Sequence, residues 1–329
     1  MVRLHALSRR PAAAALGFLT LAAIATAPVW GSNLVTSEPP ASSAAAAIYR
    51  LVMATSVAAL ALGGVAIAGR LRREDADVKR MRRELHSARL TQERFLPQDV
   101  PHVPGLDLWG MNLSSNEVSG DYYDIRCRGA GQPVVLAIAD VSGKGMPAAL
   151  LMSAVQAGLQ SQLLAGAFEL GRTMRNLNQL VCENATLGRF VTMLLAEIDR
   201  SRLTLRYVRA GHDYPIVVSR DGAVRRLSGG ETFLGLQPDV AYRAESISLA
   251  PGDTLCLYTD GVTEAADARG EMFEEARLVD VIVRHRAASA AEIGREVLRA
   301  VSAHSGRPHQ SDDVTLVIVK IDALESSAI

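Results

Sequence analysis

Four aspartates, each at the end of a short apolar run, have the clearest chemical potential in this sequence. A carboxylate at the end of a buried strand is costly to desolvate unless a cation or hydrogen bonds compensate its charge. The repeated pattern of an apolar run followed by Asp therefore predicts more than surface polarity. The four residues are Asp121, Asp140, Asp260 and Asp312.

Carboxylate oxygens are hard ligands, and a set built from Asp rather than Cys or His suits magnesium or manganese. We therefore predict that the four aspartates form one metal site. Asp312 and Asp313 are neighbours, and a strand would point them to opposite sides. We expect only Asp312 to coordinate metal directly.

Other catalytic motifs do not fit the segment around Asp140. A phosphate-binding P-loop needs glycine where Ile138 stands and Ser or Thr where Gly145 follows Lys144. Ser142 lacks the G-x-S-x-G setting of a hydrolase nucleophile. The segment instead presents an Asp at a strand end, followed by a glycine-containing turn.

Short strands and paired helices must position these residues. Alternating or continuous apolar runs predict strands at 106–112, 133–139, 190–198, 203–209, 215–219, 223–227, 254–259 and 314–321. Helices are expected at 146–166, 168–186, 274–285 and 289–304. Turn residues at 199–201 and 221–222 predict two hairpins. Hairpins with helices inserted in pairs favour an α+β layered sandwich over a doubly wound sheet.

Taken together, an ordered set of motifs over residues 96–321 resembles the metal-dependent protein phosphatases. These are the type 2C-like enzymes, here in the bacterial branch named for stage II sporulation protein E. The motifs are Phe95-Leu96-Pro97, Ser119-Gly120-Asp121-Tyr122-Tyr123-Asp124, Asp140-Val141-Ser142-Gly143-Lys144-Gly145, Phe190-Val191-Thr192, Ala210-Gly211-His212, Pro251-Gly252-Asp253, Tyr258-Thr259-Asp260-Gly261-Val262 and Asp312-Asp313-Val314-Thr315.

The resemblance implies an antiparallel β-sandwich flanked by helices, with two Mn²⁺ or Mg²⁺ ions at one end. Its implied metal ligands and catalytic residues are Asp121, Asp140, Asp260 and Asp312, joined by the backbone carbonyl of Val141, with Asp140 as the bridging ligand. The substrate would be phosphoserine or phosphothreonine on a protein. Water activated between the two ions would attack phosphorus in line, so no side-chain nucleophile is required.

Three residues around this set have more than one interpretation. Ser119 stands where the family commonly has a second glycine, although a small residue is kept. His212 is either a proton donor to the leaving group or a structural residue at a strand end. Lys144 either meets the phosphoryl group or solvates its turn.

The N-terminal 69 residues predict a membrane anchor. Residues 11–30 and 51–69 are uncharged runs long enough to cross a bilayer as helices. Arginines precede the first run and follow the second, which places both flanks in the cytoplasm. We therefore expect a multi-pass inner-membrane protein in contact with lipid, with a Ser/Pro/Ala-rich outer loop and a cytoplasmic catalytic domain. Alternatively, the first run is a cleaved signal peptide ending near Ala25-Thr26-Ala27.

Residues 70–95 predict a helical stalk, because they are charged, free of Gly and Pro and apolar at heptad spacing. The heptad residues are Leu71, Val78, Met81, Leu85, Ala88 and Phe95, with Gln92 as the polar exception. A dimeric coiled coil is one interpretation, and a single linker helix packed on the next domain is the other. Residues 322–329 remain as a C-terminal tail.

The overall composition excludes several function classes. Lys plus Arg and Asp plus Glu number 35 each, so a net charge of zero gives no case for nucleic-acid binding. Three widely spaced cysteines argue against a disulfide framework or a zinc site.

We therefore predict a membrane-anchored serine/threonine phosphatase for a regulatory protein in bacterial signalling, with an anti-sigma-factor antagonist as the substrate that the resemblance suggests. A catalytically inactive phosphoprotein-binding scaffold and a two-metal nucleotide phosphodiesterase are the alternatives.

Overall fold

The computed structural model of the chain describes residues 43–97, 99–129, 131–166, 168–185, 188–306 and 312–322. The first expected membrane span at 11–30 lies outside these residues, as does almost all of the expected tail. The chain divides into two compact units, Met1–Val78 and Lys79–Ile329. The second unit carries all of the predicted site residues.

A single helix, α3 (Ser43–Glu93), begins in the first unit and ends in the second. Residues 43–50, which we expected in an outer loop, are instead its first turns; alanines here favour helix and no Gly or Pro interrupts them. By length and composition, Ala46–Glu93 contains a stretch able to cross a membrane, with a mean hydropathy of 2.2 and no buried part. This stretch includes the second expected span.

The second unit is built on two antiparallel five-stranded sheets. The strand order of the first is β1 (Leu106–Leu113), β10 (Val314–Ile321), β9 (Thr254–Tyr258), β6 (Ile216–Val218) and β7 (Val224–Arg226). The order of the second is β2 (Asp121–Cys127), β3 (Val134–Val141), β4 (Val191–Asp199), β5 (Thr204–Ala210) and β8 (Glu245–Ser248). The expected hairpins at 199–201 and 221–222 join β4 to β5 and β6 to β7.

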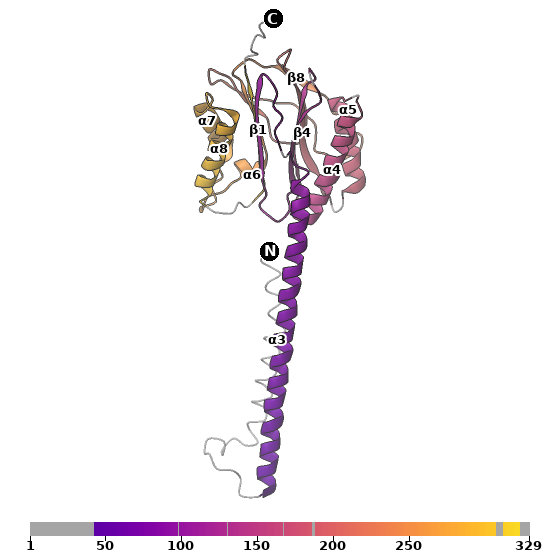
Figure 1. Cartoon of the computed structure of the whole chain (residues 1–329), viewed down its shortest axis with the longest axis vertical. Helices are drawn as coiled ribbons and strands as arrows, with labels where there is room; N and C mark the ends of the chain where they lie inside the picture. Colours follow the sequence, from indigo (N-terminus) through magenta and orange to yellow (C-terminus); the bar gives the residue numbers. More distant parts are fainter. Residues whose placement is uncertain are drawn as a thin grey trace. The chain divides into compact units, whose positions relative to one another are not determined.

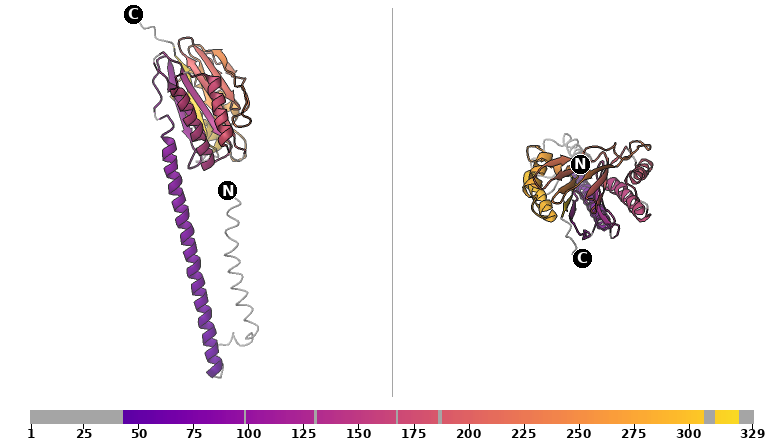
Figure 2. Two further views of the ribbon diagram at one scale, coloured as in Figure 1. Left: turned by 90° about the vertical axis from the view of Figure 1, so that its right-hand side faces the viewer. Right: turned by 90° about the horizontal axis from the view of Figure 1, so that it is seen from above.

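Helices cover the outer face of each sheet, which confirms the expected α+β sandwich. The pair α4 (Met146–Leu164) and α5 (Leu170–Asn184) lies against the second sheet (Figure 1). The pair α7 (Glu274–Arg284) and α8 (Ala290–Ser305) lies against the first (Figure 2). One short helix, α6 (Asp260–Thr263), which we did not expect, follows β9 directly.

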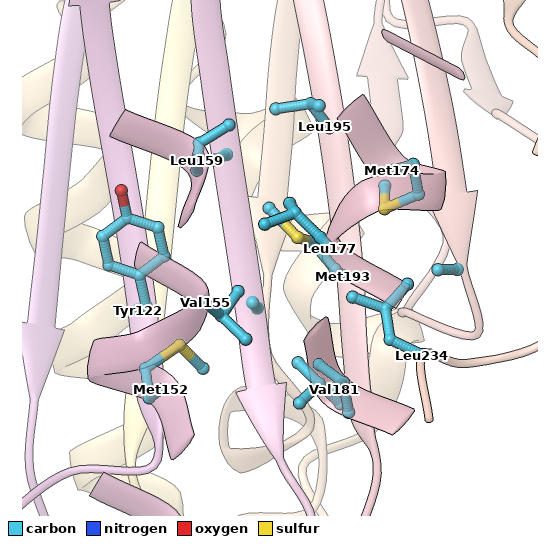
Figure 3. Packing of buried hydrophobic residues seen from close by; sticks show 14 of the residues in the cluster. Tyr122, Met152, Val155, Leu159, Met174, Leu177, Val181, Met193, Leu195 and Leu234 are labelled. Carbon is cyan, nitrogen blue, oxygen red and sulfur yellow. The ribbon is translucent and has the colours of Figure 1, made fainter. Parts of the chain in front are cut away.

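Strand β3 contributes side chains to two apolar layers, one on each face of the second sheet. Its side chains alternate between α4 and α5 on one face and the first sheet on the other, so both faces are buried. Val135, Ala137 and Ala139 belong to the helix-facing layer, where Val155 and Leu159 of α4 pack (Figure 3). A strand buried on both faces reads as a continuous apolar run, as this one does up to Asp140.

Two strands were missed because their sequences lack a strand signature. Strand β2 has the sequence DYYDIRC, whose Asp124 is buried and accepts hydrogen bonds from the Tyr122 hydroxyl and Arg126 Nε, each at 2.8 Å. Strand β8 is a mostly exposed edge strand of four residues. These segments are strands because β2 pairs with β3 and β8 pairs with β5.

Candidate metal centre

The first two predicted ligands lie opposite each other in neighbouring strands. Asp121 begins β2, Asp140 lies near the end of β3, and the two are register partners. Side chains of register partners lie on the same face of a sheet. The side chains of Asp121 and Asp140 face the first sheet. Tyr123, two residues after Asp121, and Ile138, two residues before Asp140, share this face and belong to the apolar layer between the sheets.

Two threonines of the opposite sheet hold Asp121 in place. Its Oδ2 accepts hydrogen bonds of 2.7 Å from the hydroxyls of both Thr259 and Thr315. Burial, followed by the charge of Asp140, raises the pKa of Asp121 well above its usual value, although the two hydroxyls oppose this shift. Thr259 directly precedes Asp260, and Thr315 follows Asp312 by three residues. The threonine hydroxyls therefore tie the segments that carry the predicted ligands together.

The loop before β2 is held by Asp313, the neighbour of the predicted ligand Asp312. Asp313 is 8% exposed and accepts hydrogen bonds from the backbone N–H groups of Ser115 (2.7 Å) and Gly120 (2.8 Å). The hydroxyls of Ser115 and Ser119 lie 2.9 and 2.8 Å from the same carboxylate. With its oxygens occupied in this way, Asp313 is a structural anchor of the loop that leads into Asp121.

Asp312 has a different environment. Its side chain is 41% exposed, and its Oδ2 lies 2.9 Å from Lys144 Nζ, in the turn after Asp140. The structure thus brings Lys144 to a predicted ligand, a contact that neither sequence interpretation included. Our choice of Asp312 over Asp313 stays a prediction, and the difference between their partners supports it.

Asp260 is brought to the site by a close approach of two backbones. It opens α6 directly after β9, and a Cβ on the next residue, Gly261, would lie 1.9 Å from the carbonyl oxygen of Asp313. Only glycine permits this approach. Burial, then the charges of Glu264 and Asp312, raise the pKa of Asp260.

Negative charge accumulates around these residues. Burial, then the charge of Asp260, raise the pKa of Asp140 to about 6. The same two causes raise the pKa of Asp213 to about 7, with further contributions from Glu264 and Asp140. Sequence reasoning missed Asp213, although it directly follows the Ala-Gly-His motif that we had singled out.

The turn after β3 passes close to the loop that carries Asp121. Val141, whose carbonyl is a predicted ligand, donates its N–H to Gly120 O at 3.3 Å, and a Cβ on Gly120 would lie 3.4 Å from Val141 O. Arg189 donates to Ser142 O at 2.9 Å, and a Cβ on Gly143 would lie 2.5 Å from its Nη1, so the guanidinium would have to shift. Glycine is thus needed at 143, where φ is 86°.

His212 has the surroundings of a structural residue. It is 4% exposed, and its Nδ1 lies 3.0 Å from the hydroxyl of Thr192. Burial lowers its pKa to about 3, so the ring is neutral at physiological pH. A neutral imidazole without solvent contact is a poor proton donor, which favours the structural interpretation.

These residues fit a divalent cation by donor type and charge. Asp140, Asp260 and Asp213 are hard donors, the charge of Asp260 raises the pKa of both Asp140 and Asp213, and a cation among them would offset this repulsion. Within the described residues, no three His, Cys, Asp or Glu side chains already form a cage for one ion.

Comparison with known proteins identifies relatives of the second unit. The family profile described as stage II sporulation protein E matches residues 130–322. This segment contains Asp140, Asp260 and Asp312, whereas Asp121 precedes it. The phosphoserine phosphatase RsbU of Bacillus subtilis is 30% identical over 240 residues, which cover 72% of this chain and 70% of RsbU.

Solved structures show the same fold. The SiaA-PP2C domain of Pseudomonas aeruginosa matches with a TM-score of 0.67 and 25% identity, covering 75% of this chain and 99% of that domain. A structure of the RsbU and RsbW domains of Rv1364c from Mycobacterium tuberculosis matches with a TM-score of 0.61 and 25% identity, covering 70% of this chain and 64% of the other.

Proposed function

Because the chain belongs to the stage II sporulation protein E family, we propose that it is a metal-dependent protein phosphatase that hydrolyses phosphoserine or phosphothreonine on a regulatory protein. The observation that carries this proposal is the arrangement of Asp121 and Asp140 as partners on two strands of one sheet, with Asp121 hydrogen-bonded to Thr259, the residue before Asp260, which opens the helix after β9 of the other sheet. The similarity to a phosphoserine phosphatase over 72% of this chain supports the substrate class.

The residues that would hold two Mn²⁺ or Mg²⁺ ions are Asp121, Asp140, Asp260 and Asp312, with the carbonyl of Val141. When bound, such ions activate water for attack on phosphorus and offset the charge of the phosphoryl oxygens. The protein positions the carboxylates. Thr259 and Thr315 orient Asp121, Asp313 holds the preceding loop, and the Gly261–Asp313 approach sets Asp260 beside the start of β10.

Lys144 is the cation that this site offers to a phosphoryl group. Its ammonium lies against Asp312, and both side chains are about half exposed. With a metal ion held by Asp312, Lys144 would supply a positive charge to a phosphoryl group at the same site. Neutral, buried His212 takes no part in proton transfer.

We place this activity at a membrane. The division into an anchor at 1–69, a stalk at 70–95 and a catalytic domain at 96–321 is part of the proposal, as are both spans and the cytoplasmic placement. The exposed, apolar stretch within Ala46–Glu93 supports the second span. Leu71, Val78 and Met81 are 51–64% exposed in α3, which supports a homodimer through the stalk. The proposed substrate is a phosphorylated anti-sigma-factor antagonist.

Hydrolysis of a phosphoserine peptide by the full chain, purified in detergent, tests the proposed function. We expect Mn²⁺-dependent release of phosphate that is abolished by EDTA and by Asp260→Asn. Binding of the phosphopeptide without hydrolysis would instead indicate the inactive scaffold. Hydrolysis of a cyclic dinucleotide in place of the phosphopeptide would indicate the phosphodiesterase.

A further inference from the structure

The last turn of α3 contacts the loop that leads into Asp121. Gln92 Nε2 donates to Ser119 O at 2.8 Å, and the N–H of Ser119 donates to Gln92 Oε1 at 2.9 Å. One side-chain amide thus satisfies both backbone groups of one residue, as a neighbouring strand would. Two bonds from a planar amide fix the orientation of that peptide as well as its position.

Ser119 passes this constraint to the predicted ligand two residues later. Its hydroxyl accepts a hydrogen bond of 3.0 Å from the N–H of Asp121 and lies 2.8 Å from Asp313 Oδ2. Asn112, whose amide donates to the Thr315 hydroxyl at 2.8 Å, also lies 3.4 Å from the Ser119 hydroxyl. Every hydrogen-bonding group of Ser119 therefore acts on the surroundings of Asp121.

The same end of α3 is also joined to the element that follows Asp140. The carbonyl of Phe95, which lies just beyond the helix, accepts a hydrogen bond of 2.5 Å from Gln156 in the middle of α4. A small cavity lies between these contacts and is lined by Gln92, Asp121, Tyr122 and Gln156, among others. The end of α3 is thus bonded to the segments next to both strand-borne ligands.

These contacts explain the polar exception in the heptad pattern. Leu85 and Gln92 are seven residues apart on one side of the helix, and both are partly buried, whereas Met81 is 64% exposed. Gln92 is therefore used to dock on the phosphatase fold and not to pack in a seam with a second helix.

We infer that Gln92 is a positioning residue for the metal site, which acts through Ser119 to set Asp121. This inference deepens the proposed function and rests on the same site. It predicts that the geometry of Asp121, and with it the affinity for Mn²⁺, depends on how the last turn of α3 sits on the loop at 119.

The test uses the full chain in detergent with Gln92→Met, which keeps the side-chain length but removes both hydrogen bonds. Gln92→Glu is a second variant, which keeps an acceptor for the Ser119 N–H but replaces the donor to Ser119 O with a negatively charged carboxylate oxygen. Thr91→Ala is the matched control, because Thr91 is exposed and bonds only within the helix, to Ser87 O. All four proteins are compared by Mn²⁺ calorimetry, hydrogen exchange and phosphatase kinetics.

We expect Gln92→Met to weaken Mn²⁺ binding by about 10-fold, because without both hydrogen bonds the peptide of Ser119, and Asp121 with it, is no longer fixed in the orientation that binds metal. Amide exchange over 117–121 should accelerate in metal-free protein. The half-saturating Mn²⁺ concentration should rise while KM for the phosphopeptide stays the same, and excess Mn²⁺ should restore kcat. Gln92→Glu should lie between wild type and Gln92→Met or equal the latter, and Thr91→Ala should match wild type.

Unchanged Mn²⁺ affinity and exchange in both Gln92 variants would overturn the inference. So would a loss of kcat that follows thermal stability and does not respond to Mn²⁺, because that is the result of a merely structural contact. If wild type binds Mn²⁺ but hydrolyses no phosphopeptide, the proposed function fails, while calorimetry and exchange still decide the role of Gln92.

Discussion

Asp121 and Asp140 lie directly opposite each other at the end of two hydrogen-bonded strands, facing the layer between the sheets. Burial raises the pKa of both carboxyl groups, and the next cause is the charge of Asp140 for Asp121 and the charge of Asp260 for Asp140. Strand pairing sets the two residues opposite each other, and the hydroxyls of Thr259 and Thr315 fix the carboxylate of Asp121. Their proximity has a thermodynamic consequence that can be measured.

Without metal, the protein should lose stability as pH rises from 5 to 8. A carboxyl with a folded pKa above its unfolded value binds more protons in the folded state, so its stabilising contribution is complete below the unfolded pKa. That contribution disappears as pH passes the folded pKa of about 6 for Asp140 and about 7 for Asp213. Urea unfolding in EDTA should show a decrease of about 1–3 kcal/mol.

Asp140→Asn is the matched variant for this pH dependence, because it removes one of the titrating groups and relieves its neighbours. Its unfolding free energy in EDTA should vary less between pH 5 and 8 than that of wild type. Saturating Mn²⁺ should reverse the trend in wild type, since protons and metal compete for the same oxygens. A wild-type protein that is more stable at pH 8 than at pH 5 in EDTA would contradict the prediction.

The adjacent residues Asp312 and Asp313 should respond differently to the same substitution. Asp313→Asn weakens the bonds to Ser115 and Gly120, so the unfolding free energy should fall by about 1–3 kcal/mol. Asp312→Asn should change stability by less than about 0.5 kcal/mol, because its side chain is partly exposed. Calorimetry should instead show at least about 10-fold weaker Mn²⁺ binding, the loss of one charged ligand. The reverse assignment of the two effects would identify Asp313 as the ligand.

Gly261→Ala should separate Asp260 from the start of β10. The new Cβ would lie 1.9 Å from the carbonyl oxygen of Asp313, so backbone must move. We expect a loss of about 1–3 kcal/mol from overpacking, with phosphatase activity falling by more than 10-fold. Gly69→Ala is a suitable control, because nothing lies within 4 Å of a Cβ there. Wild-type kinetics for Gly261→Ala would refute the positioning role of this approach.

His212→Gln should alter stability and leave the pH profile of catalysis unchanged in shape. The ring of His212 is neutral over the working range because burial lowers its pKa to about 3. Loss of its contact with Thr192 should lower the melting temperature. The plot of kcat/KM against pH from 6 to 9 should rise and fall at the same pH values as that of wild type. Disappearance of one limb in the variant would restore the proton-donor interpretation.

Much of the fold was predictable because its strands carry their own signals. The apolar run of β3 and the turn residues between β4 and β5 are local properties, and the structure contains both elements close to the expected residues. Strand β2 was not predictable in this way. Its Asp124 is stabilised by Tyr122 and Arg126 of the same strand only after pairing with β3 brings them into a buried setting.

The candidate site likewise contains residues that the sequence predicts and residues that it does not. The motif residues Asp121, Asp140, Asp260 and Asp312 could be predicted only as a set, since each one alone also fits an ordinary turn or strand end. Their supporting residues could not be predicted, because a hydroxyl such as that of Thr315 gains its role from a partner 194 positions away in the chain.

The sequence by itself determined which residues could do chemistry, where most of the strands and helices lie, and that an apolar segment precedes the phosphatase fold. Only the tertiary structure decided that Asp313 anchors a loop, that Lys144 meets Asp312, and that Gln92 serves Ser119 rather than a helical seam. The physical reason is range. Apolar periodicity and turn preferences act between near neighbours in the chain, whereas hydrogen bonds and charge interactions depend on distances that exist only after the sheets have packed.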